Sequence, residues 1–253
     1  MPVQGKMMAR IAQITDLHLD ESHAIRYKID ARKNLVAVLS HIKQNNIDGI
    51  VVTGDLGDIA SWEWLFSHLV GTGLPFEIIL GNHDEIEHYA NLDFFKPKIK
   101  PSGLFFTASF GLGDWIFLDS RTGEIDRDQL DWLVKVIEGR QTTENLLVFV
   151  HHPILDCDNS AMDRQVQVAL QNRDQVRKIL EEFKGDVIVF CGHYHNIHYR
   201  KSKNITQYLT PSCVMQLCLD SEEIQLESKE IGYRVIELDG QRMNTWHVPV
   251  EGN

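Results

Sequence analysis

Five short apolar runs in the sequence each lead directly into residues that can bind a metal ion. In chain order, the runs are followed by Asp16-Leu-His18, Gly54-Asp55, Gly81-Asn-His-Asp84, His151-His152 and Gly192-His-Tyr-His195. Any one of these motifs is weak, because a polar group at the end of an apolar run often only caps a strand. In an open α/β sheet, however, ligands collect at the carboxyl ends of the strands. We therefore expect five separate loops to converge on one site.

The apolar runs alternate with amphipathic segments, a pattern that predicts parallel strands connected by helices. We expect strands at 10–15, 49–53, 76–80, 145–150 and 187–190, and helices at 31–45, 61–70, 86–95, 126–138 and up to about 183. The runs 104–109 and 115–118 are typical of a hairpin, and the last third is mostly antiparallel, including 233–238 and 243–250. Because no repeat or linker interrupts the pattern, we expect a single α/β domain over residues 1–253, with two layered sheets and helices outside them.

One segment departs from this regular pattern. Residues 153–171 are polar and show no helical or strand periodicity, and they follow directly after His151 and His152. Long aperiodic segments in compact domains are often active-site lids. The sequence therefore predicts a substrate lid at 153–171.

The composition excludes several classes of function. The chain has 36 acidic and 25 basic residues and a formal net charge of -11, which argues against nucleic acid and anionic membranes as partners. No apolar stretch is long enough for a membrane span or a signal peptide, and the 4 cysteines are too few for a disulfide scaffold. We expect a cytoplasmic protein with reduced thiols. A chain of 253 residues can bury a core without metals, so a metal bound here should serve function.

The residues at the strand ends offer oxygen and imidazole nitrogen but no thiolate, a donor set that suits Mn, Fe or Zn. Seven candidate ligands are too many for one tetrahedral zinc ion, so two metals sharing a carboxylate fit better. Two ions about 3.5–4 Å apart can activate a shared water and bind both the attacking and the leaving oxygen of a phosphoryl displacement. Phosphoester hydrolysis is the chemistry that this set favours. The candidate ligands are Asp16, His18, Asp55, Asn82, His151, His193 and His195.

The order of the five motifs resembles the calcineurin-like metallophosphoesterase superfamily. Further segments resemble the bacterial class III cyclic-nucleotide phosphodiesterases and their glycerophosphodiesterase relatives, so that the resemblance covers nearly the whole chain. These segments are Leu118-Asp-Ser120, Gln129-Leu-Asp-Trp132, His151-His-Pro153, Thr210-Pro-Ser-Cys213 with Gln216, and Gly232-Tyr-Arg234. The resemblance implies a four-layer fold in which two packed mixed β-sheets are flanked by helices.

The resemblance also implies a role for each site residue. Asp16, His18 and His195 would hold the first metal, Asp55 would bridge, and Asn82, His151 and His193 would hold the second. His151 is preferred to His152 because it comes directly after the strand. His83 would contact the scissile phosphate and assist the leaving oxygen, and Asp84 is placed in the sequence to orient the imidazole of His83. The cofactors would be two divalent or mixed-valence ions of Fe, Mn or Zn.

The leading functional hypothesis is hydrolysis of a 3',5'-cyclic nucleotide, with cyclic AMP favoured, to the 5'-monophosphate. The alternative hydrolase acts on glycerophosphodiesters or other small diesters, and an alternative of another class is a metal-free interaction scaffold on the same fold. The intact set of Asp55, Asn82 and His83 argues against a scaffold. The resemblance implies a homodimer. We assign surface or capping roles to the other histidines, which are His23, His41, His68, His88, His198 and His247.

Overall fold

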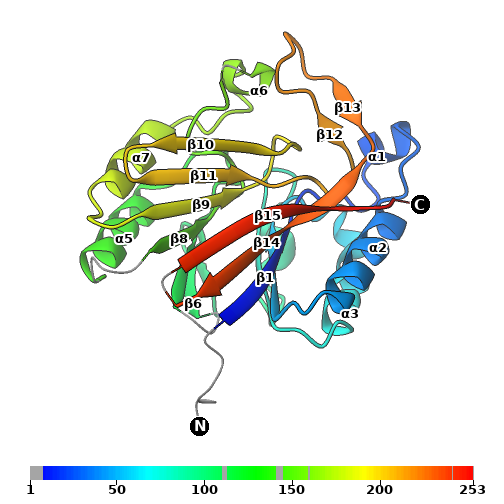
Figure 1. Ribbon diagram of the computed structural model, residues 1–253, viewed down its shortest axis with the longest axis horizontal. Helices are drawn as coiled ribbons and strands as arrows, with labels where there is room; N and C mark the ends of the chain where they lie inside the picture. Colours follow the sequence, from blue (N-terminus) through cyan, green and yellow to red (C-terminus); the bar gives the residue numbers. More distant parts are fainter. Residues whose placement is uncertain (1–7, 110–112, 141–144, 159, 241, 253) are drawn as a thin grey trace.

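Two mixed β-sheets pack against each other at the centre of the protein (Figure 1). The computed structural model describes residues 8–109, 113–140, 145–158, 160–240 and 242–252. The first sheet has the order β15-β14-β1-β2-β3, in which β1, β2 and β3 run parallel to one another and β14 is antiparallel to both of its neighbours, β1 and β15. Its strands are β1 (Met8–Ile14), β2 (Gly49–Thr53), β3 (Phe76–Ile79), β14 (Ile231–Asp239) and β15 (Arg242–Val250).

The second sheet has the order β10-β11-β9-β8-β7-β6. Strands β7, β8, β9 and β11 are parallel, and the edge strands β6 and β10 are antiparallel to their neighbours. Its strands are β6 (Phe106–Ser109), β7 (Asp114–Phe117), β8 (Leu146–Phe149), β9 (Val187–Cys191), β10 (His198–Ser202) and β11 (Ile205–Leu209). Two small ribbons complete the strands: β4 (Ile99–Lys100) with β5 (Gly103–Leu104), and β12 (Gln216–Leu217) with β13 (Leu226–Ser228).

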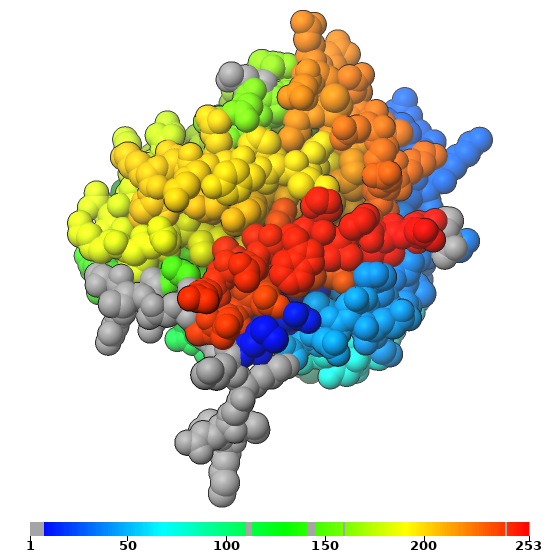
Figure 2. All heavy atoms as spheres, in the orientation of Figure 1, coloured from blue at the N-terminus to red at the C-terminus, as the bar shows by residue number. Residues whose placement is uncertain are grey.

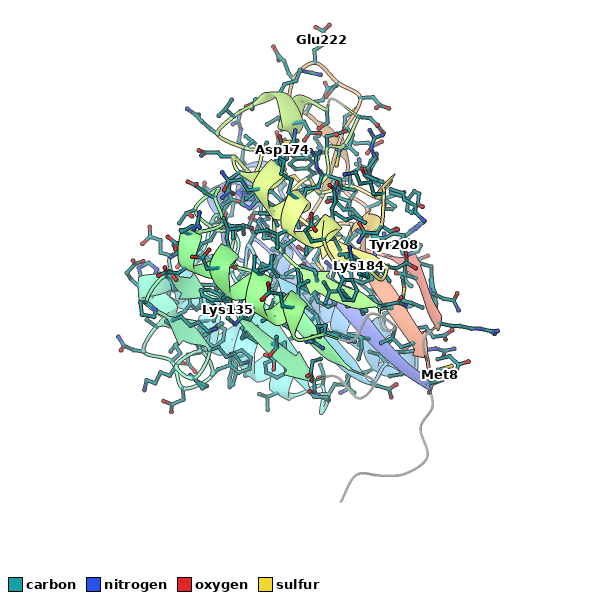
Figure 3. The ribbon with its side chains drawn as sticks, turned by 90° about the vertical axis from the view of Figure 1, so that its left-hand side faces the viewer. Met8, Lys135, Asp174, Lys184, Tyr208 and Glu222 are labelled. Carbon is teal, nitrogen blue, oxygen red and sulfur yellow. The ribbon has the colours of Figure 1, made fainter. Side chains whose placement is uncertain are left out.

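Helices cover the outer faces of both sheets and give four layers. The helices α2 and α3 pack on the first sheet. The helices α5 and α7 lie together on the outside of the second sheet, and Figure 3 labels Lys135 of α5 and Asp174 of α7. None of the helices in the described ranges is both long and apolar enough to cross a bilayer. The helices are α1 (Ser22–Arg26), α2 (Ala31–Gln44), η1 (Ile59–Ser61), α3 (Trp62–Val70), α4 (Ile86–Tyr89), α5 (Arg127–Glu138), α6 (Ala161–Arg164) and α7 (Arg173–Glu181).

The alternation of side chains along the second sheet explains the two layers of core. Phe117 and Phe149 stack at a centroid distance of 5.2 Å and pack in the core that includes the first sheet. Their neighbours Ile116 and Val148 point to the other face and pack with α5 and α7. Because successive side chains of a strand point to opposite faces, a strand covered on both sides is apolar throughout. These continuous apolar runs are the ones that predicted the strands.

The predicted fold class is confirmed, and one local prediction needs correction. The helix expected at 86–95 ends at Tyr89, and turns follow it in which Phe95 packs against Trp62 at 5.3 Å. The described part of 153–171, the segment expected to be a lid, consists of turns and irregular backbone around the short helix α6, and it buries residues such as Leu155 and Met162. Its surface lies beside the β12–β13 ribbon (Figure 2), where Arg164 donates to the carbonyl oxygens of residues 221 and 222 at 3.0 Å each.

Candidate metal centre

The ends of four strands bring six of the predicted ligands into two buried groups. Asp16, His18 and His195 form one group, and Asp55, His151 and His193 form the other. Within each group the potential ligand atoms all lie within 4.8 Å of one another. These residues follow β1, β2, β8 and β9, so the convergence expected from the sequence is present.

Asp55 lies between the two groups. Its Oδ2 is 3.6 Å from Nε2 of His18 in the first group and 3.3 Å from Nε2 of His151 in the second. The seventh predicted ligand, Asn82, follows β3 and brings its Oδ1 to 3.1 Å from Nε2 of His151. The donor set and its arrangement therefore fit two metal ions that share one carboxylate.

The backbone at the site adopts a conformation that most residues avoid. Asp16, His18, Asp55, His193 and His195 have φ values of 53°, 41°, 53°, 69° and 45°. Left-handed backbone of this kind is uncommon outside glycine and concentrates at functional sites. The turns that impose it direct Asp16 and His18 to the first ligand group, and they direct His193 and His195 to different groups.

In two histidines, a hydrogen bond to a backbone carbonyl occupies one ring nitrogen and leaves the other available to bind a metal ion. Nδ1 of His151 lies 2.8 Å from the carbonyl oxygen of Thr53, and Nε2 of His193 lies 2.8 Å from that of Val168. A carbonyl can only accept, so both nitrogens carry the proton. Nε2 of His151 and Nδ1 of His193 are then the nitrogens free to bind a metal.

The electrostatics of the cluster keep its carboxylates ionised. Burial alone would raise the pKa of Asp16, but the imidazole of His195 outweighs it and lowers the pKa to about 2. Burial opposes the shift at Asp55 as well, yet His151 holds the Asp55 pKa well below its ordinary value. Burial would lower the pKa of His151, but Asp55 outweighs this effect and raises that pKa to about 9. A metal ion at Nε2 of His151 therefore competes with a proton.

The two neighbouring histidines of the fourth motif occupy different surroundings. His151 faces Asp55 and Asn82, as described above, whereas Nδ1 of His152 lies 2.9 Å from Oγ of Ser120. The ring of His152 packs against that of His193 with centroids 4.1 Å apart. The geometry therefore favours His151 over His152 as a ligand, in agreement with the positional argument.

His83 belongs to neither of these two ligand groups, but its ring lies beside the first, with its centroid 4.8 Å from that of His18, and its side chain is 40% exposed. Its backbone N–H donates to Oδ1 of Asp55 at 3.0 Å, which ties it to the site, while its Nδ1 lies 2.7 Å from Oε2 of Glu21. The hydrogen bond with Glu21, together with Asp55, raises the pKa of His83 to about 9. Its Nε2 has no hydrogen-bond partner among the described residues.

The role expected for Asp84 is wrong in one respect, because its carboxylate does not orient His83. Asp84 is buried, and its oxygens accept hydrogen bonds from the backbone N–H of Leu56 at 2.9 Å and of Gly81 at 2.8 Å. In the turn at 81–84, the side chain of His83 points outward and that of Asp84 points inward, beneath the loop. Burial and the nearby Asp55 raise the pKa of Asp84 to about 7.

Sequence reasoning missed two residues at the site, Glu21 and His23. Both lie at the start of α1, and the ring of His23 meets that of His18 edge to face at a centroid distance of 4.3 Å. His23 was expected at the surface, and its position here is a correction. The spacing His18-x-x-Glu21 placed a carboxylate three residues beyond a predicted ligand, but such spacings are too common to single out.

The combination of this fold with two buried ligand groups defines a metal-dependent phosphoesterase. Residues 9–196 match the family model of calcineurin-like phosphoesterases, and the chain belongs to that family. This confirms the resemblance drawn from the motifs.

Individual relatives are similar over nearly the whole chain. A probable cyclic nucleotide phosphodiesterase of Fibrobacter succinogenes is 30% identical, with 95% of this chain and 93% of that protein covered. The 3',5'-cyclic adenosine monophosphate phosphodiesterase CpdA of Escherichia coli is 28% identical, with 94% and 88% covered. Among solved structures, a dimetal phosphatase from Danio rerio aligns with a TM-score of 0.63 at 12% identity, covering 96% of this chain and 99% of that one, which shows the shared fold.

Proposed function

We propose that this protein is a dinuclear phosphodiesterase that hydrolyses 3',5'-cyclic nucleotides to 5'-monophosphates, with cyclic AMP as the favoured substrate. The observation that carries the proposal is Asp55, a buried carboxylate placed between two groups of metal ligands. The names of the similar proteins support the choice of substrate, since they are cyclic nucleotide phosphodiesterases covered over most of their length.

Seven side chains would hold the metals. Asp16, His18 and His195 would bind the first ion, Asn82, His151 and His193 the second, and Asp55 both. When bound, such a pair of ions supplies Lewis-acid stabilisation of the phosphoryl oxygens and lowers the pKa of coordinated water. Oxygen and imidazole donors of this kind accept Mn, Fe or Zn.

His83 would act on the substrate directly. With Nδ1 held by Glu21, the unpartnered Nε2 is the nitrogen that can donate a proton to the departing 3'-oxygen of the ribose or hydrogen-bond to the phosphoryl group. Asp84 would contribute by holding the loop that carries Asn82 and His83, through its bonds to Leu56 and Gly81.

We expect residues 1–253 to form a single domain, in which the segment 153–171 would act as a lid and select the substrate. The segment contacts the site, because the carbonyl oxygen of Val168 accepts a hydrogen bond from the ring of His193, and α6 forms the outer part of the segment.

We further propose that the protein is a homodimer, as the resemblance implies, and that it is cytoplasmic. The 4 free cysteines support this location, because free thiols are typical of a reducing compartment.

A substrate panel tests the proposal. The purified protein, stripped with a chelator and reloaded with Mn, is assayed on cyclic AMP, cyclic GMP, a glycerophosphodiester and bis(p-nitrophenyl) phosphate. We expect a kcat/KM highest on cyclic AMP, 5'-AMP as the product, and loss of all activity in the stripped protein. If kcat/KM were higher on the glycerophosphodiester, the protein would be a glycerophosphodiesterase and not a cyclic nucleotide phosphodiesterase. A protein that binds no metal would support the scaffold alternative.

A further inference from the structure

We propose that Glu21 is a positioning residue that holds the imidazole of His83 in the orientation needed for leaving-group protonation. The inference rests on the proposed function, since it assigns the partner of the residue that would meet the substrate. It replaces Asp84, the residue that the sequence suggested for this task.

Glu21 stands where three imidazoles meet. Its side chain is only 15% exposed, and its Oε2 lies 2.7 Å from Nδ1 of His83, 3.2 Å from Nδ1 of His18 and 3.3 Å from Nδ1 of His23. The contact with His83 is the shortest of the three, and it is a hydrogen bond of the length expected when the acceptor is charged. It joins the first strand-end loop to the third, across 62 residues of sequence.

The chemistry of the carboxylate determines the tautomer of the ring that it holds. An ionised carboxylate only accepts hydrogen bonds, so the nitrogen of His83 that faces Glu21 must carry a proton. Nε2 is then the nitrogen presented to a substrate, and the ring cannot turn over without breaking the bond to Glu21. Nδ1 of His18 also faces Glu21, at 3.2 Å, while its Nε2 lies 3.0 Å from Nε2 of His195 at the first metal group.

The surrounding rings keep the carboxylate itself in place. His23 is packed edge to face against both His18 and His83, at centroid distances of 4.3 and 5.6 Å. Glu21 also sits at the N-terminal end of α1, where its carbonyl oxygen accepts from the N–H of Ile25. Backbone and side chain are therefore both fixed, as an orienting group requires.

The kinetic test compares Glu21→Ala and Glu21→Gln with a control, Asp20→Asn. Asp20 is the adjacent carboxylate, and it pairs with Arg32 and Ser61 outside the cluster. With Mn in excess, we expect the Glu21 variants to keep both ions and their KM, and to lose about 10–100-fold in kcat on cyclic AMP. The loss should be smaller on bis(p-nitrophenyl) phosphate, whose leaving group needs no proton, and Asp20→Asn should resemble the wild type. Loss of a metal ion from Glu21→Ala under these conditions would overturn the proposal.

A double mutant separates positioning from other effects. If Glu21 acts through His83, adding Glu21→Ala to His83→Ala should leave kcat on cyclic AMP unchanged. Two losses that multiply would show that Glu21 acts independently of His83 and would overturn the inference.

A measurement without substrate keeps the inference separate from the proposed function. In the zinc-loaded protein, nitrogen-detected NMR reports the tautomer and hydrogen bonding of each histidine ring. We expect a hydrogen-bonded Nδ1–H for His83 in the wild type and in Asp20→Asn, and its loss in Glu21→Ala. A protein inactive on every diester but with this signal would refute the proposed function alone, whereas an unchanged His83 spectrum in Glu21→Ala would refute the positioning role alone.

Discussion

The ring of His151 donates a hydrogen bond from Nδ1 to the carbonyl oxygen of Thr53 at 2.8 Å. This bond crosses from the end of β8 in the second sheet to the end of β2 in the first, and it leaves Nε2 directed at Asp55. The packing of the two sheets therefore sets the orientation of a proposed metal ligand.

This relationship yields a prediction for His151→Asn. The amide nitrogen of asparagine can take the place of Nδ1 and keep the bond to Thr53, but nothing replaces Nε2. We expect the variant to fold and to lose one of its two metal ions, which elemental analysis after gel filtration measures.

The matched control is His152→Asn, which keeps a polar group near Ser120 and removes an imidazole that does not face Asp55. It should retain both ions. The reverse result, with metal lost from His152→Asn and kept in His151→Asn, would exchange the roles assigned to the two histidines.

The central carboxylate gives a second prediction. In Asp55→Ala two cations would face each other without the anion that separates them, so we expect both sites to lose occupancy and activity on all diesters to disappear. Metal content and rates on bis(p-nitrophenyl) phosphate measure this. Asp58→Ala is the control, since Asp58 only caps η1 nearby. Two ions and near-normal rates in Asp55→Ala would refute a shared carboxylate.

The sequence predicted the convergence of the ligands because strand ends can be read from apolar runs. Each buried strand is recognisable by itself, and parallel strands bring their carboxyl ends to one edge, so the neighbourhood of Asp16 and Asp55 in the first sheet follows without coordinates. The approach of His151 to them depends on how the two sheets pack together. The surroundings of His83 could not be predicted in this way. Its partner Glu21 lies 62 residues away in a loop with no periodicity, and the direction of Asp84 depends on the backbone of a single turn.

A third prediction concerns His83→Ala. Because the ring lies outside both ligand groups, the variant should keep its metals and lose about 10²–10⁴-fold in kcat on cyclic AMP. An aryl diester should be less affected if His83 mainly donates a proton, and equally affected if it mainly stabilises charge on the phosphoryl oxygens. His88→Ala, which removes an exposed histidine of α4, is the control. Loss of an ion from His83→Ala would make His83 a ligand.

A glycine of the fifth motif gives a fourth prediction. A Cβ on Gly192 would lie 2.0 Å from Oγ1 of Thr15 and 2.7 Å from Oδ2 of Asp16. Gly192→Ala should therefore displace Asp16, weaken metal binding and reduce the free energy of unfolding by about 1–3 kcal/mol. Urea denaturation and metal titration measure the two effects. Gly139→Ala, where the added Cβ has its nearest atom at 3.5 Å, should change neither.

The last prediction concerns the pH dependence of stability in the metal-free protein. The hydrogen bond with Glu21 raises the pKa of His83 from 6.5 to about 9. Since the pKa is higher in the folded than in the unfolded chain, the folded state binds the proton more tightly. The resulting stabilisation is complete below about pH 6.5 and is lost as the pH rises toward about 9.

Substitution of His83 isolates this contribution, because His151 titrates in the same range. In the presence of a chelator, the urea midpoint of the wild type should fall more steeply between about pH 6.5 and 9 than that of His83→Asn. The Glu21→Gln variant should behave like His83→Asn, since both remove the charged pair. Parallel curves for all three proteins would mean that Glu21 and His83 do not form this ion pair in solution.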